Sequence, residues 1–211
     1  MTSSSVTKPA DVRGRDAEWT ALHDFASASN PVGAVGLLYG RRRTGKSFLL
    51  RRLVESLGGI YFQATESERP DALVEFGNAV ASEAVANPQA AEPIVYSDWD
   101  DAFRRRSGII VIDEFPYLLR HSPELPSLLQ RIIDEALNSV RPPIRFVLCG
   151  SSLSVIARCC EARSRSGGGP RSTCSCGQWT TARPPTSGAS MISTWQFEST
   201  PFSAERQATG P

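Results

Sequence analysis

The chain is poor in several features that would point to particular classes of protein. It has no apolar run that approaches the roughly 20 residues a membrane-spanning helix requires, and residues 1–15 contain no apolar signal-peptide stretch. The net charge of +1 gives no electrostatic support for a nucleic-acid partner or for a membrane surface. These absences predict a soluble protein of the cytoplasm.

The last quarter of the chain lacks the aliphatic residues from which a core is built. Residues 159–211 contain neither leucine nor valine and are rich in Ser, Thr, Pro, Gly and Arg. Burial of so little apolar surface cannot offset the entropy lost on ordering, so this segment is predicted to be disordered. The chain therefore divides into a flexible start over residues 1–11, a folded domain over residues 12–158 and a disordered tail.

The composition of this tail suggests a second reading frame. The chain uses arginine almost to the exclusion of lysine, which is typical of GC-rich coding, and such DNA read out of frame produces Arg, Pro, Gly, Ser, Cys and Trp. We hypothesise a frameshift near residues 158–160. The tail also holds four of the five cysteines, but their spacing fits no common zinc-ligand pattern and no histidine lies nearby.

Between residues 12 and 158, short apolar runs alternate with stretches of helical periodicity. The runs that predict buried strands are residues 32–39, 60–63, 108–112 and 145–149. Apolar residues at helical spacing separate them, most clearly over residues 122–137. Strands that alternate with helices predict an α/β fold, in which helices cover both faces of a parallel sheet.

The most specific motif is GRRRTGKS at residues 40–47, which matches G-x-x-x-x-G-K-[ST] between a predicted strand and a predicted helix. Its glycines let the backbone curl, so that successive N–H groups face one phosphate at a helix N-terminus. Lys46 is predicted to reach the β- and γ-phosphates in binding and catalysis, and the Ser47 hydroxyl to bind magnesium. The residues expected to bind the nucleotide are Gly40, Arg41, Arg42, Arg43, Thr44, Gly45, Lys46 and Ser47. The three arginines also fit solvent-exposed loop positions.

Polar residues follow two of the other predicted strands. Asp113 and Glu114 end the apolar run GIIVI, at the edge where parallel sheets bind ligands. Asp113 is expected to hold magnesium and Glu114 to orient the attacking water, although a solvated turn before Pro116 is the alternative. Ser151 follows the run RFVLC and is expected to sense the γ-phosphate or hold the water, but serine is equally common in turns.

Three segments together resemble a known family. GLLYGRRRTGKSFLLRRL, IIVIDEFPYLL and FVLCGSSLSV look like the archaeal-type ATPase family of P-loop proteins, which is related to the AAA+ and STAND ATPases. The resemblance covers residues 12–157 and implies ATP, Mg²⁺ and an Asp–Glu catalytic pair. The segment Gly14-Arg15-x-x-Glu18 resembles a box that the family carries ahead of its phosphate loop, which implies that Arg15 lies near the adenine.

The resemblance also implies a five-stranded core, whereas residues 12–158 supply four predicted strands. The missing strand would lie beside the phosphate-loop strand, so we expect an incomplete sheet with an exposed apolar edge. Reduced stability, aggregation and weak or absent turnover would follow. No arginine finger and no protein partner can be assigned from the sequence.

These patterns favour a magnesium-dependent ATPase domain that couples hydrolysis to a conformational switch. A regulatory nucleotide-binding switch without turnover shares every motif, and a non-functional truncated fragment is a further alternative. A small-molecule kinase is less favoured, because Glu114 beside Asp113 suits activation of water better than phosphorylation of an acceptor.

Overall fold

The computed structural model describes residues 8–28, 34–84, 94–104, 106–138, 143–150, 174–182 and 192–198. The helices are α1 (Asp16–Ser27), α2 (Lys46–Leu57), α3 (Arg69–Ala84), α4 (Trp99–Arg104), α5 (Phe115–His121) and α6 (Leu125–Leu137). The strands are β1 (Ala34–Gly40), β2 (Ile60–Gln63), β3 (Gly108–Asp113), β4 (Ile144–Gly150), β5 (Cys174–Ala182) and β6 (Ile192–Glu198). Within these ranges, no helix combines the length and the apolar character needed to cross a membrane.

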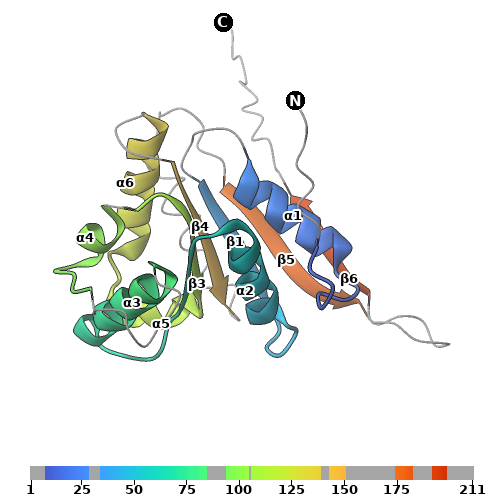
Figure 1. Cartoon of the computed structure of the whole chain (residues 1–211), viewed down its shortest axis with the longest axis horizontal. Helices are drawn as coiled ribbons and strands as arrows, with labels where there is room; N and C mark the ends of the chain where they lie inside the picture. The colour runs from blue at the N-terminus through green and yellow to red at the C-terminus, as the bar shows by residue number, and fades with distance from the viewer. Residues whose placement is uncertain are drawn as a thin grey trace, which may run out of the picture.

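The strands form one sheet in the order β2-β3-β4-β1-β5-β6 (Figure 1). The first five strands in this order pair in parallel, and β6 is antiparallel to β5. In the middle of the sheet, Leu37 of β1 lies opposite Leu148 of β4. The predicted α/β fold with a parallel sheet is confirmed, and the strand that leads into the phosphate loop lies in its interior.

Helices cover both faces of this sheet because apolar side chains alternate along its strands. Leu37 joins a core cluster with α3, α4, α5 and α6, whereas the next residue, Leu38, joins a second cluster with α1 and α2. Ile110 and Val111 divide in the same way along β3. The period of two that separates the faces of a strand therefore places α2, with the phosphate loop at its N-terminus, on the same face as α1 (Figure 1).

Helix α1 packs closely on β1, and this brings the segment before it to the phosphate loop. A Cβ atom at Gly36 would stand 3.0 Å from the Phe25 ring, so a larger residue at this position would require the ring to shift away from the strand. Trp19 and Leu22 are buried in the same contact. The docking of α1 is thus set by apolar burial, and Arg15 immediately precedes this helix.

The structure adds elements where the sequence predicts none. After β3 the structure has two helices, α5 and α6, whereas the sequence predicts one. Pro116 lies in the first turn of α5, where a backbone N–H has no partner within the helix, so the proline is compatible with this additional helix. Strands β5 and β6 come from residues 159–211, and β5 pairs with the edge of β1 that we expected to be bare. The unpaired backbone groups of an open edge can hydrogen-bond to any extended segment, so the pairing of β5 with β1 cannot be predicted from side-chain composition. The domain boundary at residue 158 stays a prediction.

The larger of the two core clusters is built around aromatic rings. The Phe76 ring of α3 makes edge contacts with Phe62 at 5.4 Å, Trp99 at 5.8 Å and Phe103 at 5.4 Å between ring centroids. Trp99 also donates from its indole nitrogen to the Ser122 hydroxyl at 2.9 Å. This cluster holds α3 and α4 on the face of the sheet opposite α2.

We predict that Phe76→Ala lowers the free energy of unfolding by about 3–5 kcal/mol, because the substitution removes a fully buried ring and leaves a cavity between the rings packed around it. Urea denaturation monitored by circular dichroism measures this change. Val74→Ala in the same helix is the matched control, because Val74 is 49% exposed and its truncation should change stability by less than about 0.5 kcal/mol. Equal effects of the two substitutions would contradict this account of the core.

Candidate nucleotide-binding site

The loop between β1 and α2 turns sharply through residues with positive φ. Arg43 has a φ of 61° and Gly45 a φ of 83°, and Gly45 is the residue that precedes the first turn of α2. The first N–H groups of a helix have no partner within it, and they carry partial positive charge. The loop thus presents a helix N-terminus suited to an anion, as the motif predicts.

The Lys46 side chain folds back over this loop. Its ammonium donates to the carbonyl oxygens of Gly40 at 2.9 Å and Arg41 at 2.6 Å, and the side chain is buried. The Thr44 hydroxyl also donates to the Arg41 carbonyl, at 2.9 Å. These bonds keep a positive charge beside the loop backbone at the start of α2.

The Asp113 carboxylate ends β3 and is 2% exposed. Burial raises its pKa, but hydrogen bonds from the hydroxyls of Ser47 and Tyr61, the Cys149 thiol and the Glu114 backbone N–H outweigh burial, so the pKa lies below its ordinary value. The carboxylate is therefore ionised at neutral pH. Burial and the nearby Asp113 charge raise the pKa of the Cys149 thiol, which keeps it a hydrogen-bond donor.

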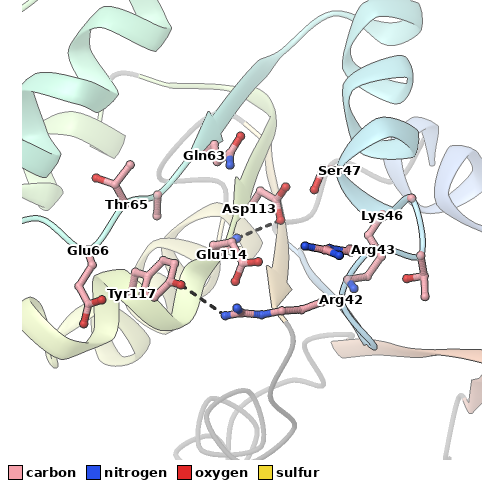
Figure 2. Close-up of a pocket in the computed structure, with 13 residues that line it drawn as sticks. Arg42, Arg43, Lys46, Ser47, Gln63, Thr65, Glu66, Asp113, Glu114 and Tyr117 are labelled. Atoms are coloured by element: carbon pink, nitrogen blue, oxygen red, sulfur yellow. Dashed lines mark hydrogen bonds between the residues drawn. The ribbon is translucent and has the colours of Figure 1, made fainter.

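Glu114 occupies a strained position between β3 and α5. Its φ of 52° lies in the left-handed region, which is costly for a residue with a side chain, and its N–H donates to Asp113 Oδ1 at 2.9 Å. The side chain is half-buried. In Figure 2 the carboxylate of Glu114 faces the side of the pocket where Arg42 and Lys46 lie.

A pocket of about 800 Å³ joins these groups. The residues that line it are Arg42, Arg43, Thr44, Gly45, Lys46, Ser47, Gln63, Ala64, Thr65, Glu66, Asp113, Glu114 and Tyr117. The structure thus brings together most of the predicted nucleotide ligands with the acidic pair (Figure 2). Gly40 and Arg41 do not line this pocket; their carbonyl oxygens face Lys46 instead.

The pocket wall opposite the phosphate loop was not recognised from the sequence. It consists of residues 63–66, at the carboxyl end of β2, and Tyr117 of α5. Arg42 donates to the Tyr117 hydroxyl at 3.4 Å, so the phosphate loop and α5 are in contact (Figure 2). β2 neighbours β3 in the sheet, so both strands end at the same edge; this neighbourhood is a property of the tertiary structure and leaves no local signal in the sequence.

Arg15, a further predicted residue, does not line the pocket. Arg15 donates to the Thr44 carbonyl, which ties the segment before α1 to the phosphate loop, and burial lowers the pKa of its guanidinium. The proximity of Arg15 to an adenine stays a prediction. Ser151 lies outside the described residues, and its role also stays a prediction.

The donor set at this edge fits a magnesium nucleotide. The Ser47 hydroxyl donates a hydrogen bond to the Asp113 carboxylate, so two oxygen atoms that can ligate a metal lie side by side. Oxygen is the ligand that Mg²⁺ prefers. The cationic phosphate loop at the N-terminus of α2 lines the same pocket and suits the phosphate groups.

The comparison with protein families agrees with this geometry. A family described as an ATPase domain predominantly from Archaea matches residues 14–172. The chain belongs to this family. Membership implies ATP as the ligand, and the match reaches past the boundary at residue 158 that composition suggests.

Two individual proteins extend the comparison of this ATPase domain. An uncharacterized protein of Methanocaldococcus jannaschii is 34% identical over 146 residues, which cover 67% of this chain and 30% of that protein. The chain therefore spans about a third of the length of this relative. The structure of a Walker-type ATPase of Pyrococcus abyssi has a TM-score of 0.57 and 19% identity, covers 83% of this chain and 56% of that one, and supports the fold.

We predict that Gly45→Ala weakens ATP binding. A side chain at this left-handed φ costs about 1–2 kcal/mol, and a change of backbone conformation that removes this strain would turn the N–H groups of the loop away from the phosphate. Gly58→Ala is the control. Gly58 has a φ of 76° at the other end of α2, so alanine there strains the backbone of the same helix but leaves the phosphate loop unchanged. Calorimetric titration with ATP compares the two. An equal loss of affinity in both variants would show that only helix stability matters.

Proposed function

We propose that the domain binds ATP together with Mg²⁺, hydrolyses it to ADP and phosphate, and couples this reaction to a change at α5. The observation that carries the proposal is the pocket in which Lys46 and Ser47 of α2 face the buried Asp113 and its neighbour Glu114 (Figure 2). Membership of an ATPase-domain family supports the nucleotide.

Each of these residues has a defined task in the proposal. Lys46 and the N-terminal N–H groups of α2 bind the phosphates, and Lys46 stabilises the charge that develops on transfer. Ser47 and Asp113 hold the metal, which supplies charge neutralisation when bound. Glu114 orients and polarises the attacking water from its half-buried position beside Asp113.

Coupling to a conformational change rests on the link between the phosphate loop and α5. Glu114 directly precedes α5, and the Tyr117 hydroxyl of this helix accepts from Arg42 at 3.4 Å. A nucleotide that engages Arg42 competes with this bond, so occupancy of the pocket can be transmitted to α5. This link also favours the second candidate function, a nucleotide-dependent switch without turnover.

We expect Lys46→Ala to weaken ATP binding by about 10- to 100-fold, because it removes charge-assisted hydrogen bonds to phosphate. Calorimetry or fluorescence of a labelled ATP analogue measures this affinity. Lys8→Ala is the matched control, because Lys8 is the other lysine of the chain and forms an ion pair with Asp16. Unchanged affinity in Lys46→Ala would remove the phosphate loop from nucleotide binding.

We expect Glu114→Gln to lower the rate of ATP hydrolysis at least about 100-fold while ATP affinity stays within a factor of about two, because only activation of the water is lost. Phosphate release measures the rate. Glu66→Gln is the control on the opposite wall, where Glu66 pairs with Arg120, and its rate should stay near that of the unmodified chain. Hydrolysis that survives in Glu114→Gln excludes the water-orienting role, whereas ATP binding without hydrolysis in the unmodified chain supports the switch.

A further inference from the structure

Tyr61 of β2 contacts the Asp113 carboxylate from a neighbouring strand. Its hydroxyl donates to Asp113 Oδ2 at 2.7 Å. In the sheet, Tyr61 lies opposite Val111, and Gln63 lies opposite Asp113. The phenol therefore extends along the sheet toward the carboxyl edge, and its partner is Asp113, two residues after Val111 on β3.

The two oxygens of this carboxylate have different partners. Oδ1 accepts from the Glu114 N–H at 2.9 Å, whereas Oδ2 accepts from Tyr61 at 2.7 Å. A backbone donor on one oxygen and a side-chain donor on the other restrict rotation of the carboxylate. Of these two donors, the Tyr61 hydroxyl is the one a substitution can remove.

Tyr61 is itself held by the helix that carries the phosphate loop. The Arg51 guanidinium lies 4.4 Å from the centre of the Tyr61 ring and donates to Gln63 Oε1 at 2.9 Å. Arg51 is four residues after Ser47 in α2, about one helical turn along. The helix that supplies the Ser47 hydroxyl therefore also clamps the tyrosine that orients Asp113.

We propose that Tyr61 is a positioning residue for Asp113, and that its hydroxyl sets the Mg²⁺ affinity of the nucleotide pocket. The inference rests on the proposed function, because it assigns the metal to Ser47 and Asp113. A group that hydrogen-bonds to a metal-ligating carboxylate orients it, and loss of such a partner typically weakens metal binding about 10- to 100-fold. A purely structural role, in which the hydroxyl only satisfies a buried acceptor, would change stability without changing the metal dependence.

The test is Tyr61→Phe in the full chain, which keeps the ring and its contact with Arg51. Affinity for a fluorescent ATP analogue is measured in EDTA and across a Mg²⁺ titration, with a thermal melt of each protein. The expected result is that the Mg²⁺ concentration for half-maximal enhancement of affinity rises about 10-fold, whereas affinity in EDTA is unchanged. Tyr96→Phe is the matched control, because the Tyr96 hydroxyl accepts from Arg106 at 3.0 Å in the opposite core cluster.

A second variant covers the case in which Tyr61→Phe does not fold. Arg51→Met removes the guanidinium that lies over the Tyr61 ring and its exposed hydrogen bond to Gln63. It should raise the Mg²⁺ concentration for half-maximal enhancement, as Tyr61→Phe does, but by a smaller factor. An unchanged Mg²⁺ titration in the folded variants would overturn the inference, as would an equal loss of affinity in EDTA. If the unmodified chain shows no Mg²⁺-dependent binding of the analogue, the proposed function itself fails.

Discussion

An ionised carboxylate stays inside a protein only where hydrogen bonds replace the water that it loses. Asp113 meets this condition with donors from several elements: Tyr61 on β2, Cys149 on β4, Ser47 at the start of α2 and the backbone of Glu114. Each donor fixes the position of its own element relative to the carboxyl end of β3. The arrangement of the pocket therefore depends on satisfying this one charge.

The sheet makes such convergence possible. Because β2, β3 and β4 run in parallel, their carboxyl ends meet at one edge, and the period of two brings Tyr61, Asp113 and Cys149 to the face that α2 covers. The opposite face is sealed by the aromatic cluster around Phe76 and Trp99. The polar groups at this edge therefore lie on a sheet whose other face is packed against an apolar core, which holds the strands in place.

The residues of the site differ in how far they could be predicted from the sequence. The phosphate loop and the pair Asp113-Glu114 were recognisable because each is a contiguous motif at the end of an apolar run. Tyr61 and Tyr117 were missed because their partners are distant in the chain: 52 residues separate Tyr61 from Asp113, and 75 separate Tyr117 from Arg42. An isolated tyrosine in a strand or in a helix carries no local signal of such a contact.

Apart from α5, the order of helices and strands as far as β4, the parallel sheet and the phosphate loop were determined by the sequence itself, because apolar periodicity and glycine positions act locally along the chain. The pairing of β5 with β1 was decided only by the tertiary structure. The backbone hydrogen bonds that join two strands do not depend on which side chains the strands carry, so composition could not predict them. The donors to Asp113 were likewise decided by the tertiary structure, because the register of neighbouring strands and the docking of α2 determine which hydroxyl reaches the carboxylate.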